Sequence, residues 1–99
     1  MPAPFAIERL DHCSVLITDV ERSRRFYRDV LGLKEINKPR TFDFVVLWFD
    51  LGNHHIHLLL KPRPDALSAR HFALRVSDAA AARRYFQGLG MPLEETTPI

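Results

Sequence analysis

Apolar and polar residues alternate along several stretches of the first two thirds of the chain, and alternation with a period of two is typical of β-strands that bury one face. This alternation predicts a strand over residues 7–18. A short strand is predicted over 33–37, and further strands over the strongly β-forming run 42–51 and over 54–61. Gly52 and Asn53 separate the last two strands, and this dipeptide favours the positive φ angles of a two-residue hairpin. We therefore predict a β-hairpin that places Trp48 opposite His57.

Helical spacing replaces the alternation in two stretches. The residues from Thr18 to Glu21 fit a capping box, apolar positions then recur every three or four residues, and Gly32 provides a C-cap. The helices predicted in this way cover residues 19–31 and 78–89. Further strands are predicted over 71–77 and, near the end, over 92–97. Pro62 and Pro64 interrupt the pattern and indicate a linker.

The chain nearly repeats itself. From His12 to His71 the offset is 59 positions, and residues 11–19 return as 70–78. The offset then decreases by one, so that residues 31–33 align with 89–91. Because a repeated unit places equivalent residues around a pseudo-two-fold axis, His12 and His71 are expected to converge on one point.

This order of elements predicts the α+β class, with paired βαβββ modules. Residues 1–99 are expected to form a single domain, since 99 residues can bury one core. Module one covers about 7–61. Module two covers about 68–99 and is truncated, because its last two strands are missing.

Composition and charge exclude several classes of protein. The net charge is +2, but the arginines alternate with acidic residues, so no basic stripe indicates a nucleic-acid partner. No stretch approaches the ~18 uninterrupted apolar residues of a membrane span. The single cysteine, Cys13, is on the helix side of its strand, where it is expected to pack as a small apolar residue. We expect a cytoplasmic protein without membrane contact.

Three predicted strands each place a histidine on the face away from the helices. These residues are His12, His57 and His71. Neutral imidazole is the commonest ligand of transition metals in proteins, so the pattern predicts a divalent ion (Zn, Ni, Mn or Fe) bound by all three. Packing or surface roles are the alternative, and a hairpin shifted by one residue would exchange His57 for His54.

Three further residues of this face are candidates for substrate binding. Trp48 would line a pocket or fill the interior, and His55, opposite Asp50, would lie at the rim or form a cross-strand pair. Arg75 follows His71 by two residues, and its planar fork suits a carboxylate or phosphonate, although a solvated arginine at the strand end fits slightly better. No catalytic base can be assigned; Glu94 and Glu95 are weak candidates.

These residues resemble the vicinal oxygen chelate superfamily, which includes glyoxalase I, extradiol dioxygenases, fosfomycin-resistance enzymes and bleomycin-binding proteins. The resemblance is carried by Leu10–His12, by Asp19–Ser23 with Phe26–Leu33, and by Arg70–Val76. It implies that each module curls into half a cup around a divalent metal, with His12 and His71 as ligands and His57 at the position of a third. The family's fourth ligand, a glutamate on the last strand of module two, is not found in this sequence.

The resemblance implies two alternative functions, an enzyme and a binding protein. One is a metal-dependent lyase or dioxygenase that acts on a small oxygenated metabolite through bidentate chelation. The other is a metal-independent binding protein of the bleomycin-resistance type, or a truncated inactive homologue. Because the incomplete second module would leave a strand edge and an apolar face uncovered, we expect a homodimer in which His12 and His57 meet His71 of the partner subunit.

Overall fold

The computed structural model describes residues 3–39 and 42–94. The chain divides into two compact units, Met1–Leu67 and Ser68–Ile99. In order, the elements are β1 His12–Ile17, α1 Val20–Arg24, η1 Arg25–Val30, β2 Lys34–Ile36, β3 Val45–Asp50, β4 His55–Leu60 and α2 Ala79–Gly88. The first six elements belong to the first unit and form the predicted βαβββ arrangement.

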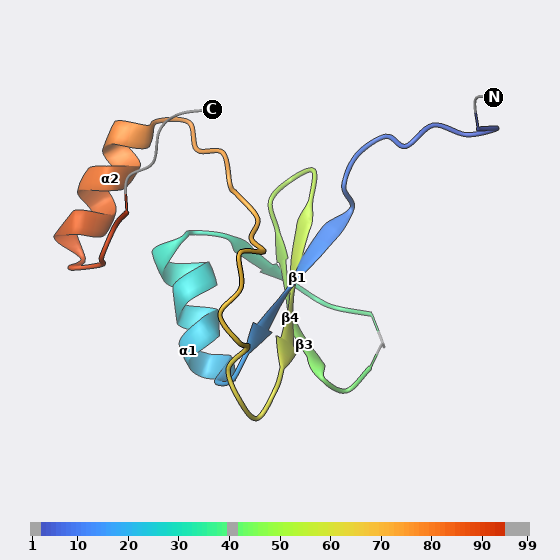
Figure 1. Ribbon diagram of the computed structural model, residues 1–99, viewed down its shortest axis with the longest axis horizontal. Coiled ribbons are helices and arrows are strands. Elements are labelled where there is room, and N and C mark those ends of the chain that lie inside the picture. The colour runs from blue at the N-terminus through green and yellow to red at the C-terminus, as the bar shows by residue number, and fades with distance from the viewer. Residues whose placement is uncertain (1–2, 40–41, 95–99) are drawn as a thin grey trace. The chain divides into compact units, whose positions relative to one another are not determined.

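The four strands form one mixed sheet in the order β1-β4-β3-β2 (Figure 1). β1 runs parallel to β4, whereas β3 is antiparallel to both of its neighbours. The parallel pair needs a long crossover, and the segment from α1 to β3 provides it. The first strand of the module therefore lies beside the fourth.

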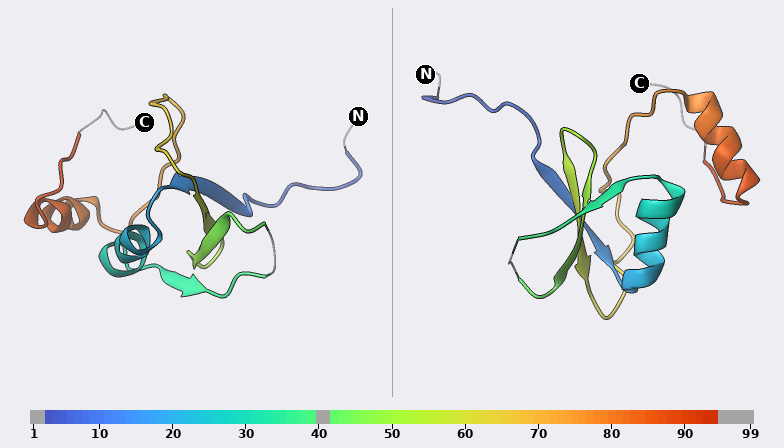
Figure 2. Two further views of the ribbon diagram at one scale, coloured as in Figure 1. Left: turned by 90° about the horizontal axis from the view of Figure 1, so that it is seen from below. Right: turned by 180° about the vertical axis from the view of Figure 1, so that it is seen from behind.

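The helical segment covers one face of the sheet, as the turned view shows (Figure 2), and the core lies between them. Phe49, Ile56 and Leu58 are fully buried in this core. Cys13 and Val15 of β1 pack against it, so the predicted faces of β1 and β4 are confirmed. Full burial of a side chain of this size contributes roughly 2–3 kcal/mol to the stability of the fold.

The first helix is not a regular α-helix. Its N-cap is Asp19, one residue later than the Thr18 of the predicted capping box, and the Asp19 carboxylate accepts a hydrogen bond from Arg22 N at 3.0 Å. After Arg24 the chain continues as the π-helix η1, in which Leu31 N donates to Phe26 O, five residues earlier, at 2.9 Å. A π-helix accommodates one extra residue per turn.

The π-helix explains why the repeat loses its register. In the second unit Asp78 caps α2 in the same way, by accepting from Ala81 N at 3.0 Å, but α2 is α-helical throughout. Both helices end at a glycine of positive φ, 72° at Gly32 and 73° at Gly90. Cap and glycine are 13 positions apart in the first copy and 12 in the second. The extra residue lies in η1.

The hairpin has the predicted register. Gly52 has a φ of 101°, and its N–H donates to the Asp50 carboxylate at 2.7 Å. Trp48 is opposite His57, and Asp50 is opposite His55. The alternative register, which would have exchanged His57 for His54, is therefore wrong.

The second unit departs from the prediction. Residues 71–77 form no strand, and Phe72, Leu74 and Val76 are 44%, 40% and 52% exposed. A strand needs a neighbour for its backbone hydrogen bonds, and the described part of this unit holds no other strand. Residues 92–94 are likewise not in a strand, and the rest of the predicted strand over 92–97 lies outside the described residues.

The helices are short. The longest in the described part of the chain, α2, has 10 residues, whereas a bilayer span needs about 20. No helix there is long and apolar enough to cross a membrane. The cytoplasmic location stays a prediction.

Candidate functional site

Three aromatic rings stack on the face of the sheet away from the helices. The rings of Trp48 and His57 are 3.8 Å apart between centroids and 4° from parallel. The rings of His57 and His12 are 4.2 Å apart and 20° from parallel. Because two rings cannot occupy the same face of one imidazole, His57 lies in the middle of this aromatic stack. The strand order places β4 beside both β1 and β3, so it brings the three residues together.

His57 is held neutral by its surroundings. It is 7% exposed, and its Nε2 atom has no hydrogen-bond partner among the described residues. Burial, followed by the nearby rings of His12 and His55, lowers the pKa of His57 from the usual 6.5 to about 4. At neutral pH the imidazole therefore keeps its lone pair, as a metal ligand must.

The imidazole of His12 is hydrogen-bonded to the carboxylate of the preceding residue, Asp11. His12 Nδ1 lies 3.0 Å from Oδ2 of Asp11. This hydrogen bond lowers the pKa of Asp11, so the carboxylate is ionised and can only accept. Nδ1 therefore carries the proton, and the lone pair is on Nε2. A carboxylate in this position is typical of histidines that ligate metals, because it fixes the tautomer and orients the ring.

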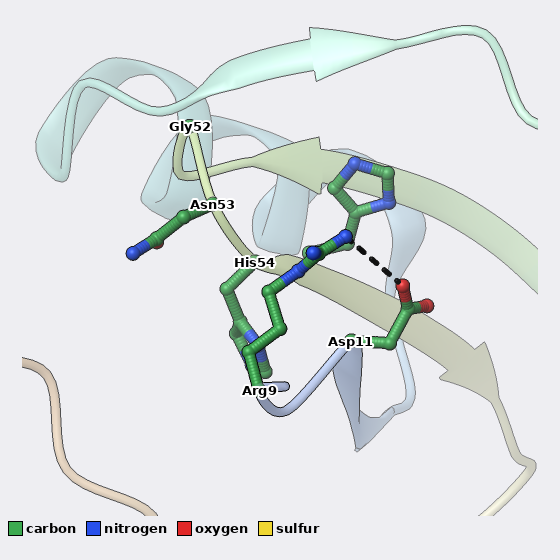
Figure 3. Close-up of a pocket in the computed structure, with 6 residues that line it drawn as sticks. Arg9, Asp11, Gly52, Asn53 and His54 are labelled. Atoms are coloured by element: carbon green, nitrogen blue, oxygen red, sulfur yellow. Dashed lines mark ion pairs between the residues drawn. The ribbon is translucent and has the colours of Figure 1, made fainter. Parts of the chain in front are cut away.

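A polar pocket of about 370 Å³ opens at the hairpin end of the sheet (Figure 3). We call it the hairpin pocket; its lining residues are Arg9, Asp11, Gly52, Asn53, His54 and His55. Arg9 forms an ion pair with Asp11 at 3.9 Å, which Figure 3 marks. His54 donates from Nδ1 to the carbonyl of Leu10 at 2.9 Å. Sequence reasoning missed Arg9, although it precedes the Asp11–His12 pair by only two residues.

His55 connects the hairpin pocket with the aromatic stack. Its ring is 5.7 Å from that of His57 and 5.6 Å from that of Trp48. Its Nε2 lies 3.9 Å from Oδ1 of Asp50, which agrees with the predicted cross-strand pair. A ligand in the pocket would therefore lie close to the stacked rings.

The other predicted site residues belong to the second unit. His71 is exposed, and its Nδ1 donates to the carbonyl of Ala69 at 2.9 Å. Arg75 and Glu94 are exposed, and Glu95 lies outside the described residues. That His71 joins His12 and His57 in one site stays a prediction.

The donor set fits a metal in kind but not in its present geometry. His12 and His57 both offer imidazole nitrogens, but imidazole lone pairs lie in the ring plane, and two nearly parallel rings 4.2 Å apart do not direct them at one ion. Within residues 3–39 and 42–94, no three His, Cys, Asp or Glu side chains group closely enough to hold a metal. The side chain of His12 is 45% exposed, whereas His57 is buried.

The chain is similar in sequence and in fold to proteins that carry glyoxalase names. A curated Arabidopsis thaliana protein, Glyoxylase I 4, is 38% identical over 64 residues, which cover 65% of this chain and 37% of that protein. The chain thus spans little more than a third of this relative. A glyoxalase family protein from Bacillus anthracis is 25% identical, with a TM-score of 0.76 over 89% of this chain and 75% of its own.

Two further solved structures share the fold. Lactoylglutathione lyase from Agrobacterium tumefaciens is 22% identical, with a TM-score of 0.67 over 91% of this chain and 76% of its own. The fosfomycin resistance protein FosX from Listeria monocytogenes, in complex with Mn(II) and a dihydroxypropylphosphonic acid, is 16% identical, with a TM-score of 0.73 over 95% of this chain and 76% of its own.

The family model of these proteins also matches the sequence itself. The match covers residues 9–70, which is more than half of the chain and includes the whole sheet. It contains the aromatic stack and the hairpin pocket. The chain belongs to the Glyoxalase/Bleomycin resistance protein/Dioxygenase superfamily.

Proposed function

We propose that this protein is a metal-dependent, glyoxalase-like enzyme of the lyase or dioxygenase type that acts on a small oxygenated metabolite. The observation that carries the proposal is the pair of imidazoles on one sheet face, His57 held neutral by burial and His12 oriented by Asp11. Mn(II) in FosX and the lyase activity in the name of the Agrobacterium protein support the same chemistry.

In this proposal each predicted site residue has one role. His12 Nε2 and His57 Nε2 hold a divalent ion, and His71 supplies the third imidazole. When bound, the ion would provide positive charge against which two adjacent substrate oxygens develop negative charge. Trp48 and His55 line the substrate site, where Trp48 excludes water from one side of His57. Arg75 binds an anionic group of the substrate through its guanidinium fork.

We further propose a homodimer in which the third ligand is His71 of the partner subunit. The exposed apolar residues of 71–76 support this arrangement, because a second copy would cover them. A two-fold dimer of this kind has two equivalent sites, each built from both chains.

The test is zinc content after exchange of subunits. The wild type should bind one zinc per chain, and His12→Ala and His71→Ala should each bind none. A mixture of the two variants forms heterodimers in about half of the dimers, each with one intact site, so about a quarter of the wild-type zinc should return. His54→Ala is the matched control: it removes a nearby histidine that is not a proposed ligand and should leave zinc binding intact.

Three results would contradict these proposals in different ways. Absence of zinc from the wild type, or its retention by both alanine variants, would overturn the metal site. Loss of zinc in each variant without recovery in the mixture would show that one chain supplies all three imidazoles. The dimeric arrangement would then be wrong, and the metal-dependent function would stand.

A metal-independent binding protein is the second candidate. One observation favours it: the rings of His12 and His57 are stacked rather than convergent. Such a protein would bind its ligand equally well before and after treatment with a chelator. Elemental analysis of the purified protein separates the two functions in one measurement.

A further inference from the structure

Two buried nitrogen atoms in the aromatic stack have no hydrogen-bond partner within the described part of the chain. They are Nε1 of Trp48 and Nε2 of His57. Burial of a polar group without a partner is costly, so such atoms are rare and usually belong to a site that a ligand or water completes. The proposed function uses His57 Nε2 as a metal ligand. It gives Trp48 Nε1 no role.

The indole nitrogen differs from every other polar group of this face in its chemistry. An indole N–H can only donate, whereas a neutral histidine both donates and accepts. The atom that it contacts must therefore be an acceptor, such as a carbonyl, carboxylate or phosphonate oxygen. The indole ring is parallel to the His57 ring at 3.8 Å, so an acceptor beside Trp48 Nε1 is also beside His57.

The aromatic stack has one side that can open. Trp48 is partly buried on β3, and His57 is buried on β4, whereas the His12 side chain is 45% exposed. His12 is the outer ring of the stack, and it is hydrogen-bonded to Asp11, a residue whose own side chain is 76% exposed. Exposed side chains change rotamer within nanoseconds. Rotation of His12 would uncover one face of His57 while the Trp48–His57 pair stays in place.

We propose that the Trp48 indole N–H is a ligand-contacting donor that binds an acceptor oxygen of the substrate beside His57. This inference rests on the proposed function, because it takes the face of the sheet away from the helices as the substrate site. It makes Trp48 a specificity-determining residue. Ligands with an acceptor oxygen at this point bind, and ligands with a methyl or ammonium group there are rejected, since they leave the N–H without a partner. The same donor would stabilise negative charge that develops on that oxygen.

The experiment uses the fact that the chain contains a single tryptophan. Uniformly ¹⁵N-labelled protein therefore gives one indole N–H resonance, which reports on Trp48 alone. The full chain is loaded with zinc and titrated with acetohydroxamate, a small probe with two adjacent oxygens. The indole proton resonance should move downfield, and its exchange with water should slow several-fold as the probe saturates the site.

A variant gives the same test by affinity. Trp48→Phe keeps an aromatic ring against His57 but removes the N–H, so the dissociation constant of acetohydroxamate should rise about 5- to 10-fold, as expected for one lost hydrogen bond, while zinc content stays the same. Tyr27→Phe is the matched control. It also removes one polar group from an aromatic ring, but Tyr27 stacks on Phe49 on the helix side of the sheet, so its affinity should not change.

The outcomes distinguish this inference from the proposed function. If the zinc-loaded protein binds the probe but the indole resonance does not move and Trp48→Phe binds equally well, the inference is wrong and the metal site stands. If the wild type takes up no zinc, the proposed function fails and the inference fails with it. A shifted resonance together with weakened binding by Trp48→Phe alone would support the inference.

Discussion

Lowering the pH from about 7.5 to about 4.5 should destabilise the metal-free protein through a single side chain, His57. Its pKa is lowered from 6.5 in the unfolded chain to about 4 in the fold, mainly by burial. Above pH 6.5 the imidazole is neutral in both states and stability is unaffected. Between 6.5 and 4 only the unfolded chain takes up the proton, so stability decreases as the pH falls.

The size of the effect follows from the two pKa values. The full difference corresponds to about 3 kcal/mol below pH 4, and about 2 kcal/mol is already lost at pH 5. This is a large part of the 5–15 kcal/mol that is typical of a domain. The carboxylates of Asp11 and Asp29 also have lowered pKa values, from their hydrogen bonds to His12 and Arg28. The contribution of these carboxylates is lost only as the pH falls below about 5, whereas that of His57 is lost from about pH 6.5, so the two effects can be distinguished by their pH ranges.

Urea unfolding in the presence of a chelator, repeated at half-unit steps of pH, measures this dependence. His57→Phe keeps an aromatic ring beside Trp48 but cannot be protonated, so its stability should be nearly flat between pH 6.5 and 4.5. His71→Gln removes an exposed histidine and should retain the wild-type slope. An equal slope in wild type and His57→Phe would refute the assignment of the acid sensitivity to this buried imidazole.

Three further predictions concern packing, the carboxylate and the π-helix. Leu58→Ala should lower the free energy of unfolding by about 2–5 kcal/mol because Leu58 is fully buried. Leu60→Ala, at a 38% exposed position, should lower it by less than about 1 kcal/mol, and equal losses in urea unfolding would contradict the core described above. Asp11→Asn should weaken zinc binding about 10-fold by releasing the orientation of His12, and unchanged affinity in a competition titration with a chromophoric chelator would show that the carboxylate is not needed. Deletion of Arg28 from η1 should leave a folded protein with a regular α-helix and less than about 1 kcal/mol of lost stability, while deletion of Leu58 should abolish the cooperative unfolding transition. Loss of the folded circular dichroism spectrum in both deletions would refute the π-helix as the site of the extra residue.

The faces and the register of the first unit could be predicted from the sequence because they follow from local rules. Alternation separates Cys13 from His12, and the positive φ of Gly52 fixes which residues of β3 and β4 are opposite. The aspartate caps of both helices have an equally local signal in the sequence.

The remaining features depend on tertiary context. Residues 71–77 have the composition of a strand, but a strand also requires a neighbour that the pattern does not contain. The π-helix has no propensity signal of its own; only the change of offset within the repeat indicates it. Stacking of His12 on His57, rather than convergence, is a matter of rotamers, and the hairpin pocket forms because Arg9 and His54 meet across 45 positions of sequence.

The extra residue in η1 bears on how this fold tolerates changes of length. Side chains of a strand alternate, so one inserted residue that was passed on to the sheet would turn every following strand over, and Trp48 and His57 would face the helices. The wider turn of the π-helix accommodates the extra residue before Gly32. From Gly32 on, the backbone again matches the second copy, in which Gly90 has nearly the same φ angle. A change of length by one residue is thus accommodated within the helix. The face of the sheet away from the helices keeps the same side chains, although the length of the helical segment before it differs.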